Sequence, residues 1–201
     1  MKITKLTATD AAQAGITLAK AMMDDPLAAY FLPDPQVRKR LLPKHLAVLA
    51  RYCILFGEAH AIGASLQSCA IWLPPRETEV TPERAEAAGM EQLAEIIGAQ
   101  AIEKFFGVIE HMEGVHSKVM TDDHWYLQVI GVDPTLQNSG HGRALLLPIL
   151  RRADQTGHPC YLETFAQGTV GYYQKLGFET VTSGIEPSSA LAYWTMKREP
   201  E

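Results

Sequence analysis

The spacing of apolar residues along the first 75 positions changes twice between a strand pattern and a helical pattern. A short alternating run begins the chain, two stretches with apolar residues at helical spacing follow, and two short apolar runs come before the Pro-Pro pair at 74–75. The expected elements are an edge strand at 3–6, a helix capped by Thr9 or Asp10 and ended by residues 24–26, a helix opened by residues 33–35 and shifted or kinked at Pro43, and strands at 59–62 and 66–73 around a turn at Gly63.

Residues 76–120 carry a helical and acidic pattern, with apolar positions such as Leu93, Ile97 and Phe105. Residues 76–123 hold eleven acidic and four basic side chains, a charge of −7, whereas the rest of the chain is +2. One interpretation is a solvated helical face, which is the usual role of such a charge run. The other is that these carboxylates surround a site for cations.

The last third of the chain has the clearest order. The pattern predicts a strand at 124–132, a helix at 140–156, a strand at 160–165, a short helix at 169–175, and strands at 178–182 and 190–196. A strand, a helix and a strand in this order predict a right-handed parallel crossover. No repeat and no linker interrupts the chain, so we expect one α/β domain over residues 1–201.

Composition narrows the functional classes. Hydrophobic residues make up 47% of the 201 positions, which excludes a disordered or low-complexity chain. The net charge of −5 and the absence of a basic stripe argue against a nucleic-acid binder, and no apolar segment predicts a signal peptide or a membrane span. The three dispersed cysteines predict reduced thiols, so we expect a soluble cytoplasmic protein. These cysteines are Cys53, Cys69 and Cys160.

A glycine-bearing loop follows the strand that ends at Val132. Gly140 and Gly142 allow successive backbone N–H groups to turn toward one anion, and the next helix adds its positive N-terminal end. Physical chemistry alone therefore predicts a pyrophosphate cradle at this loop and helix start. The alternative is a helix capped by Asn138 or Ser139, in which the glycines only permit the turn.

Other phosphate and nucleophile motifs do not fit this loop. Leu145 occupies the place of the third glycine of a dinucleotide fingerprint, and Gly142 is followed by Arg143 rather than by the Lys of a P-loop. Ser139 lacks the flanking glycines of a hydrolase nucleophile. The remaining pattern is Val132-Asp-Pro134 followed by Gln137-x-x-Gly-x-Gly.

This pattern resembles the coenzyme A pyrophosphate motif of the GNAT superfamily of acyl-CoA-dependent N-acyltransferases. The resemblance continues in Tyr161-Leu-Glu163-Thr and in the Tyr-x-x-x-Gly-Phe signature from Tyr173 to Phe178. With Leu147-Pro148 and Trp194-x-Met, the chain is most similar to the puromycin N-acetyltransferase group. The match is tight over residues 124–198 and loose over 1–75. It implies a mixed, mostly antiparallel sheet of six or seven strands, flanked by helices and splayed between the fourth and fifth strands.

The resemblance also implies a role for each motif residue. The backbone of Ile130, Gly131 and Val132 would pair with the pantetheine arm of acetyl-CoA. The loop residues Gln137, Asn138, Ser139, Gly140, His141, Gly142 and Arg143 would wrap the pyrophosphate. Thr169 takes a cofactor-binding position where relatives often have Asn, and His141 replaces a frequent Lys or Arg. Tyr173 would protonate the leaving thiolate, and Glu163 or a water molecule would take the proton of the amine.

Each catalytic candidate has a structural alternative. Tyr173 is also compatible with core packing, and because adjacent helical residues point about 100° apart, the motif register selects Tyr173 rather than Tyr172 for the cleft. Glu163, inside an otherwise apolar strand, either acts as a base or pairs with a nearby Arg or Lys. His111 and His116 are five residues apart, so no metal site is expected. We expect His124 at the surface and no covalent role for Cys160.

The expected activity is transfer of the acetyl group of acetyl-CoA to a primary amine of a small molecule, by direct attack on the thioester and without a metal. A cationic amine is the expected acceptor, with no nucleic-acid or membrane partner. The alternatives are a non-catalytic acyl-CoA sensor and a protein or peptide N-acetyltransferase. The resemblance also allows a homodimer through the C-terminal strands. The sequence does not identify the acceptor.

Overall fold

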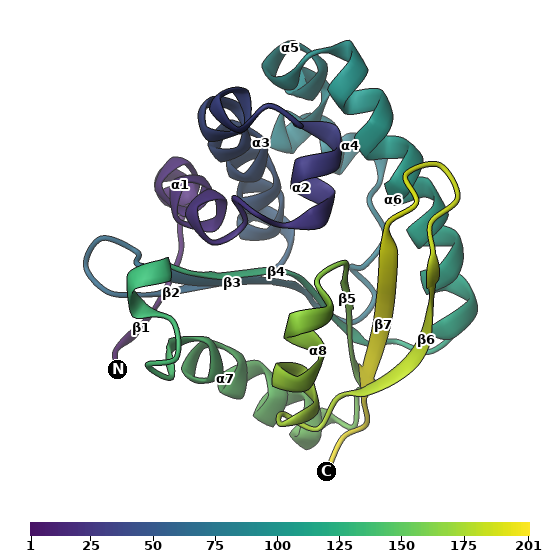
Figure 1. Ribbon diagram of the computed structural model, residues 1–201. Helices are drawn as coiled ribbons and strands as arrows, with labels where there is room; N and C mark the ends of the chain where they lie inside the picture. The colour runs from purple at the N-terminus through teal and green to yellow at the C-terminus, as the bar shows by residue number, and fades with distance from the viewer.

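The computed structural model describes residues 1–201, which build a seven-stranded sheet covered by helices on both faces (Figure 1). The strands are β1 (Ile3–Lys5), β2 (Glu58–Ile62), β3 (Ser68–Leu73), β4 (Trp125–Val132), β5 (Cys160–Thr164), β6 (Glu179–Ile185) and β7 (Ala192–Arg198). Their order across the sheet is β1-β2-β3-β4-β5-β7-β6, and only the β4–β5 pair is parallel. The predicted mixed, mostly antiparallel sheet is confirmed, with seven strands.

Two groups of helices cover the sheet. On one face lie α1 (Ala11–Ala21), α2 (Pro26–Phe31), α3 (Pro35–Phe56), α4 (Pro82–Ala88), α5 (Leu93–Ile97) and α6 (Ala99–Val119). On the other face lie α7 (His141–Thr156) and α8 (Gln167–Gln174). Figure 1 shows α1, α2 and α3 above the sheet, α7 below it, and α6 along the side where β7 and β6 end the sheet.

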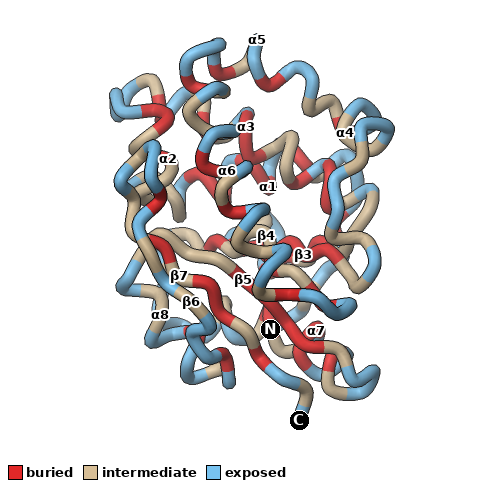
Figure 2. Tube along the Cα trace, turned by 90° about the vertical axis from the view of Figure 1, so that its right-hand side faces the viewer, coloured by how far each residue is buried: buried red, intermediate tan, exposed pale blue.

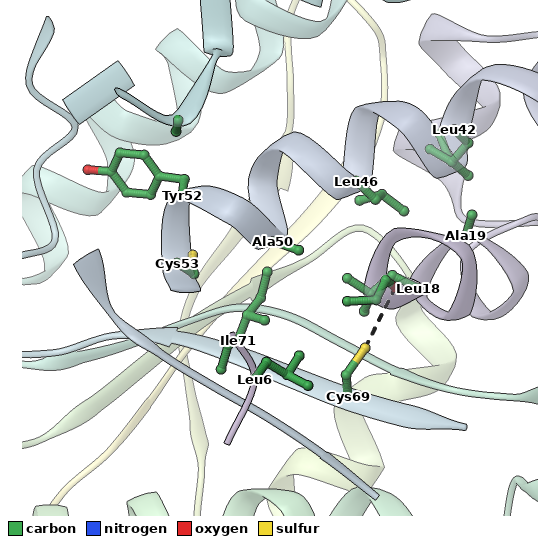
Figure 3. Packing of buried hydrophobic residues seen from close by; sticks show 14 of the residues in the cluster. Leu6, Leu18, Ala19, Leu42, Leu46, Ala50, Tyr52, Cys53, Cys69 and Ile71 are labelled. Atoms are coloured by element: carbon green, nitrogen blue, oxygen red, sulfur yellow. Dashed lines mark hydrogen bonds between the residues drawn. The ribbon is translucent and has the colours of Figure 1, made fainter. Parts of the chain in front are cut away.

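The alternation of side chains along β3 builds a core on each face. Ile71 packs toward α1 and α3, and Trp72 packs toward α7, with neither side chain exposed. Figure 3 shows the first of these cores, where Cys69 places its Sγ 3.8 Å from the carbonyl oxygen of Ala14 in α1. In Figure 2 the buried positions run through the central strands. The sheet is therefore buried at its centre on both sides.

All three cysteines are buried and free. Burial raises the pKa of the Cys69 thiol and of the Cys160 thiol to about 12, and it raises the pKa of the Cys53 thiol as well. Each thiol is therefore protonated and unreactive at neutral pH. The expectation of reduced thiols without a covalent role is consistent with this burial.

In the N-terminal third α1 and α3 begin and end near the expected residues, and the structure differs from the expectation in local detail. Neither Thr9 nor Asp10 caps α1 through its side chain; instead the Asp10 carboxylate accepts hydrogen bonds from the N–H and hydroxyl of Thr7 in the preceding turn. Asp25 does more than end a helix, because its carboxylate accepts from two amides at the start of α2, an element that the pattern did not predict. Pro43 lies inside α3 and does not shift its start, which Asp34 caps.

The acidic segment forms α4, α5 and α6 rather than one continuous helix. Of its eleven acidic side chains, all except Glu77 are exposed. Glu77 forms an ion pair with Arg84, and Arg76 pairs with Asp123 at 2.7 Å. Most of the negative charge in this segment is therefore a solvated face, as the first interpretation predicted.

A β-bulge at Gln128 bends β4. In the pairing with β3, Trp72 lies opposite Leu127 and Ile71 lies opposite Val129, so Gln128 is one extra residue on β4. Beyond Leu127, β4 has no partner on its β5 side, because the parallel pairing ends at Leu127 and Leu162. The two strands separate from this point onward. The predicted splay between the fourth and fifth strands is confirmed.

Candidate active site

The opening between β4 and β5 leads to the loop that joins β4 to α7. Asp133 anchors the beginning of this loop, because its carboxylate accepts from the N–H and hydroxyl of Thr135 and pairs with Lys20 of α1 at 3.1 Å. These contacts lower the pKa of Asp133 to about 2, so the carboxylate stays charged. Asn138 and Gly140 then take positive φ angles of 62° and 86°, which turn the chain sharply into α7.

The backbone amides of this loop point away from internal partners. No N–H group from Gln137 to Arg143 donates to a protein acceptor; the next amide, that of Ala144, bonds to the carbonyl oxygen of Gly140. Gly140 is the N-cap of α7 and supplies no side-chain cap. Unpaired amides at a helix start bind anions well, because they add directed donors to the positive end of the helix dipole.

The competing interpretation of this loop, a helix capped by Asn138 or Ser139, is wrong. The hydroxyl of Ser139 donates to the carbonyl oxygen of Leu136 and also lies 2.6 Å from Nδ1 of His141. Neither side chain reaches an amide of the first turn of α7. The free amides therefore remain available to a ligand.

A cavity of about 290 Å³ lies between α7 and the turn that follows α8, and Arg143 is the one residue of the 137–143 segment that lines it. Its lining includes Arg143, Arg151 and Lys175, none of which forms an ion pair within the protein. Arg198 lines it too, but this guanidinium is neutralised by Asp154 at 2.6 Å. With the carboxylates of Asp154 and Glu201 also in the lining, the cavity carries charges of both signs, and its unpaired cations are Arg143, Arg151 and Lys175.

Tyr172 faces the loop, which corrects the expectation that it points away from the cleft. A Cβ placed on Gly142 would lie 2.6 Å from the Tyr172 hydroxyl and 3.7 Å from Cδ1 of Ile130. Burial raises the pKa of Tyr172 to about 12, although Arg143 opposes the rise. The Tyr172 phenol therefore stands between the end of β4 and the start of α7.

Tyr173 is the more buried of the two tyrosines, with 8% of its surface exposed against 36% for Tyr172. Its ring packs on Phe178 at 6.0 Å, in the core beneath α7 and α8. Burial raises the pKa of Tyr173 well above its usual value, and the charges of Tyr172 and Asp25 raise it further. The phenol is thus protonated at neutral pH and close enough to Asp25, in the α1–α2 turn, to interact with it electrostatically. Tyr173 can therefore serve either as a core residue or as a proton donor.

Glu163 lies on the opposite face of β5 from Cys160 and Leu162, toward α6. Its Oε1 accepts a hydrogen bond of 2.8 Å from the hydroxyl of Tyr161, so its partner is a phenol and not the expected Arg or Lys. Burial raises the pKa of Glu163 to about 7, while the neighbouring phenols of Tyr161 and Tyr126 oppose the rise. This carboxyl can take up or release a proton near neutral pH.

The remaining predicted site residues have local partners. Thr169 donates to the carbonyl oxygen of Ala166 and lies 2.9 Å from the hydroxyl of Thr164, so its side chain holds α8 to the end of β5. Gly131 is needed for packing, because a Cβ there would lie 3.0 Å from side-chain atoms of Leu18 and Ala21 in α1. Ile130 packs on the α7 side, and Val132 pairs with Ser68 of β3.

His124 is buried, with 5% of its surface exposed, so its expected place at the surface was wrong. Its Nδ1 lies 2.7 Å from the carbonyl oxygen of Asp122, and its Nε2 lies 2.7 Å from Nε2 of His116. No group of three or more metal-ligating side chains is present. No sequence pattern predicts this histidine pair, because the two residues belong to different elements.

Comparison with known proteins assigns the family. The family model described as "Acetyltransferase (GNAT) family" matches residues 66–178, more than half of the chain, from the turn before β3 to the end of the α8 region. The chain belongs to the GNAT acetyltransferase family. Members of this family generally use acetyl-CoA, and the unpaired amides at the start of α7 fit its pyrophosphate. The narrower likeness to the puromycin N-acetyltransferase group is not among these findings.

Individual relatives agree with the family. An uncharacterised N-acetyltransferase of Schizosaccharomyces pombe is 25% identical over 184 residues, covering 89% of this chain and 74% of the relative. The solved structure named histone acetyltransferase HPA2 and related acetyltransferase, from Corynebacterium glutamicum, has a TM-score of 0.72 at 18% identity, covering 100% of this chain and 96% of the other. Arylalkylamine N-acetyltransferase 2 of Aedes aegypti has a TM-score of 0.65 at 14% identity, covering 100% and 99%. The two structures share the GNAT fold with this chain.

The helices of this GNAT protein contain no stretch that is both long and apolar enough to cross a lipid bilayer.

Proposed function

We propose that this protein transfers the acetyl group of acetyl-CoA to a primary amine of a small molecule. The observation that carries the proposal is the run of free backbone amides from Gln137 to Arg143, placed where β4 leaves β5. When bound, acetyl-CoA supplies a thioester carbonyl that an amine can attack directly. The acetyltransferase family and the name of the mosquito relative support an amine as the acceptor.

The backbone on either side of the opening would hold the thioester. Ile130, Gly131 and Val132 would pair with the pantetheine arm as if it were an added strand, because β4 has no partner there. The amides of residues 137–143 would bind the pyrophosphate, and Arg143 with Lys175 would attract the remaining phosphate charge. A backbone N–H near Ile130 would stabilise the developing oxyanion.

Two side chains would move protons. Tyr173 would donate its phenolic proton to the leaving sulfur, since its raised pKa keeps it protonated until a strong base is formed beside it. Glu163 would accept the proton of the incoming ammonium, directly or through water, since its pKa lies near 7. Neither step uses a metal. Thr169 and His141 would support the cofactor site through the contacts that fix α8 and the loop.

A cationic acceptor fits the charges on the α6 side of the sheet. Glu113 of α6 acts electrostatically on both Glu163 and Tyr126, and Asp25 lies within range of Tyr173. Glu113 and Asp25 thus act electrostatically on side chains of β4, β5 and α8. They would raise the local concentration of cationic amines.

The decisive experiment follows free thiol release from acetyl-CoA across a panel of small primary amines, a peptide N-terminus and a buffer blank. Release with at least one small amine, together with the acetylated product by mass spectrometry, supports the proposal. Release only with the peptide would move the acceptor to proteins. A raised melting temperature with acetyl-CoA but no release with any amine would identify a non-catalytic acyl-CoA-binding domain and overturn the proposed activity.

A matched pair of variants tests the cradle. Arg143→Gln removes a cation at the start of α7, and Arg51→Gln removes an exposed cation of α3. We expect Arg143→Gln to weaken acetyl-CoA binding about tenfold, the size of one charge-assisted hydrogen bond, and Arg51→Gln to leave it unchanged. Equal affinities in isothermal titration calorimetry would exclude Arg143 from the cofactor site.

A further inference from the structure

Two phenols surround the carboxyl of Glu163 at the point where β5 leaves β4. Tyr161, two residues earlier on β5, donates its hydroxyl hydrogen to Oε1 of Glu163 at 2.8 Å. Tyr126 of β4 lies beside the same carboxylate, and the two tyrosine rings are 5.4 Å apart. Burial raises the pKa of both phenols, so they remain donors and do not take the proton from Glu163.

The imidazole of His116 on α6 packs against both phenol rings. It stacks on Tyr161 with ring centres 4.3 Å apart and planes 10° from parallel, and it meets the ring of Tyr126 edge-on at 4.6 Å. A flat ring in this place restricts the tilt of both tyrosines. The orientation of the donors to Glu163 therefore depends on where His116 is held.

His124 holds His116 through a hydrogen bond whose direction the structure fixes. Nδ1 of His124 faces the carbonyl oxygen of Asp122 at 2.7 Å, and a carbonyl only accepts, so Nδ1 carries the hydrogen. Nε2 of neutral His124 is then an acceptor, and Nε2–H of His116 donates to it at 2.7 Å. Burial lowers the pKa of His116 to about 4 and that of His124 below its usual value, so both are neutral at pH 7.

The charged groups around this pair come from several elements. Glu113 of α6 raises the pKa of Tyr126 and of Glu163 electrostatically. The pKa of His124 is raised by Asp122 and Asp123, which precede β4, and lowered by Lys197 of β7. None of them forms an ion pair with either imidazole, so the polar contacts of the two rings are with each other and with the Asp122 carbonyl.

From this geometry we infer that His116, anchored by His124, is a positioning residue for Glu163 and acts through Tyr161 and Tyr126. The inference rests on the proposed function, in which Glu163 accepts the proton of the ammonium. In that step one N–H bond of the ammonium breaks, one O–H bond forms on the carboxylate, and the nitrogen keeps the electron pair that attacks the thioester. The phenols keep their own protons and stabilise the charged carboxylate before the transfer.

The first test compares the acid limb of the pH profile of kcat in four proteins. Tyr161→Phe removes the direct donor, so the limb should move upward by about one pH unit, the effect of losing one hydrogen bond to a charged group. His116→Phe keeps a flat ring but removes the anchoring donor, and should move the limb in the same direction by less. The double variant should move the limb by less than the sum of the two single shifts, because the Tyr161 part of the His116 effect is already lost in Tyr161→Phe and only the Tyr126 part remains.

Glu113→Gln is the matched control on the same helix. Its carboxylate raises the pKa of Glu163, so its removal should move the limb downward, opposite to the His116 variant. His116→Gln keeps a donor for His124 but has no ring, and it should reproduce the upward shift if stacking on Tyr161 matters. An unmoved limb in both His116 variants, or additive losses in the double variant, would overturn the inference.

A second measurement does not depend on turnover. Carbon-13 NMR of labelled glutamate carboxyls gives the Glu163 titration directly, with Glu163→Gln identifying its signal. If the midpoint of the Glu163 titration lies at higher pH in folded His116→Phe than in wild type, the positioning role is supported. This holds even if the wild-type protein acetylates no amine, an outcome that would remove only the proposed activity. An identical Glu163 titration in wild type and His116→Phe would overturn the positioning role while leaving the activity intact.

Discussion

The hydroxyl of Tyr172 on α8 lies directly over the α-carbon of Gly142 on α7, where a Cβ would meet it at 2.6 Å. This contact connects the helix of the tyrosine signature to the first turn of the helix that carries the free amides. The glycine at this position therefore serves helix contact as well as access to the backbone. A side chain here and the Tyr172 hydroxyl compete for one space.

Gly142→Ala should therefore destabilise the first turn of α7. Adding Tyr172→Phe to the same chain should recover the lost stability. The new methyl group forces a shift worth about 1–3 kcal/mol, whereas without the hydroxyl the nearest ring atom is 3.4 Å away, an ordinary contact. Thermal unfolding and acetyl-CoA titration of both single variants and the double variant measure the effect. If the double variant is no better than Gly142→Ala, the hydroxyl is not the obstacle.

Tyr173→Phe should lower kcat by about 10²–10⁴-fold and leave acetyl-CoA binding unchanged. The ring and its packing on Phe178 remain, and only the proton donor is lost. The loss should shrink with a thioester whose thiol leaves more easily. Because Tyr172 faces the cofactor loop, the suitable control is Tyr52→Phe, a buried tyrosine whose hydroxyl bonds to the Glu79 carbonyl oxygen. Normal kcat in Tyr173→Phe would restrict Tyr173 to core packing.

Glu113→Gln should lower kcat/KM for a dicationic amine several-fold at low ionic strength and change it little for a neutral one. The reason is the loss of one negative charge near Glu163, an effect that salt screens. Glu95→Gln on α5 removes an equally exposed carboxylate elsewhere in the acidic segment and is the control. Equal losses for the dicationic and the neutral amine would show that Glu113 does not select acceptors by charge.

His45 should make the fold sensitive to moderate acid. Burial against Phe31 and Phe105 lowers its pKa to about 4, and its Nδ1 has no partner. In the unfolded chain the His45 imidazole binds a proton near pH 6.5, whereas in the folded chain it does so only near pH 4. The free energy of unfolding is therefore highest above pH 6.5 and falls by up to about 3 kcal/mol as the pH approaches 4.

His45→Phe should flatten this dependence between pH 6.5 and 4, as measured by urea unfolding at several pH values. The control is His158→Gln, which replaces a half-exposed histidine outside this core. The half-buried His116 keeps part of the slope in every variant, because its pKa is also lowered to about 4. A slope unchanged by His45→Phe would show that this ring titrates alike in the folded and unfolded chain.

The order of elements in the last third was predictable because each has a strong local signal. Val132-Asp-Pro134 ends a strand, Gly140 begins a helix, and the spacing to Phe178 leaves room for one parallel strand and one short helix. The short helix α2 was missed because Asp25-Pro26 ends one helix and caps the next with the same residues. The pattern predicts only the end of the first helix at these residues and not the start of the second.

The candidate site was predictable where one stretch of chain makes it and not where several do. Residues 137–143, the proposed cradle, lie within one loop, so the free amides follow from the local sequence. The orientation of Tyr172 and the burial of His124 depend on α7 and α6, which pack from elsewhere in the chain. No periodicity within one element contains that information.

The bulge at Gln128 is a single inserted residue that bears on the proposed cofactor opening rather than on the core. Without Gln128, Leu127 and Val129 would become consecutive, and both would keep their β3 partners and their faces of the sheet. Deleting Gln128 should therefore straighten β4 and let it continue beside β5. The opening between β4 and β5 would then close, while the packing of the core stays the same. Replacing the Gln128 side chain should neither straighten β4 nor close the opening. What matters at this position is that β4 has one extra residue, and not that the residue carries a glutamine side chain.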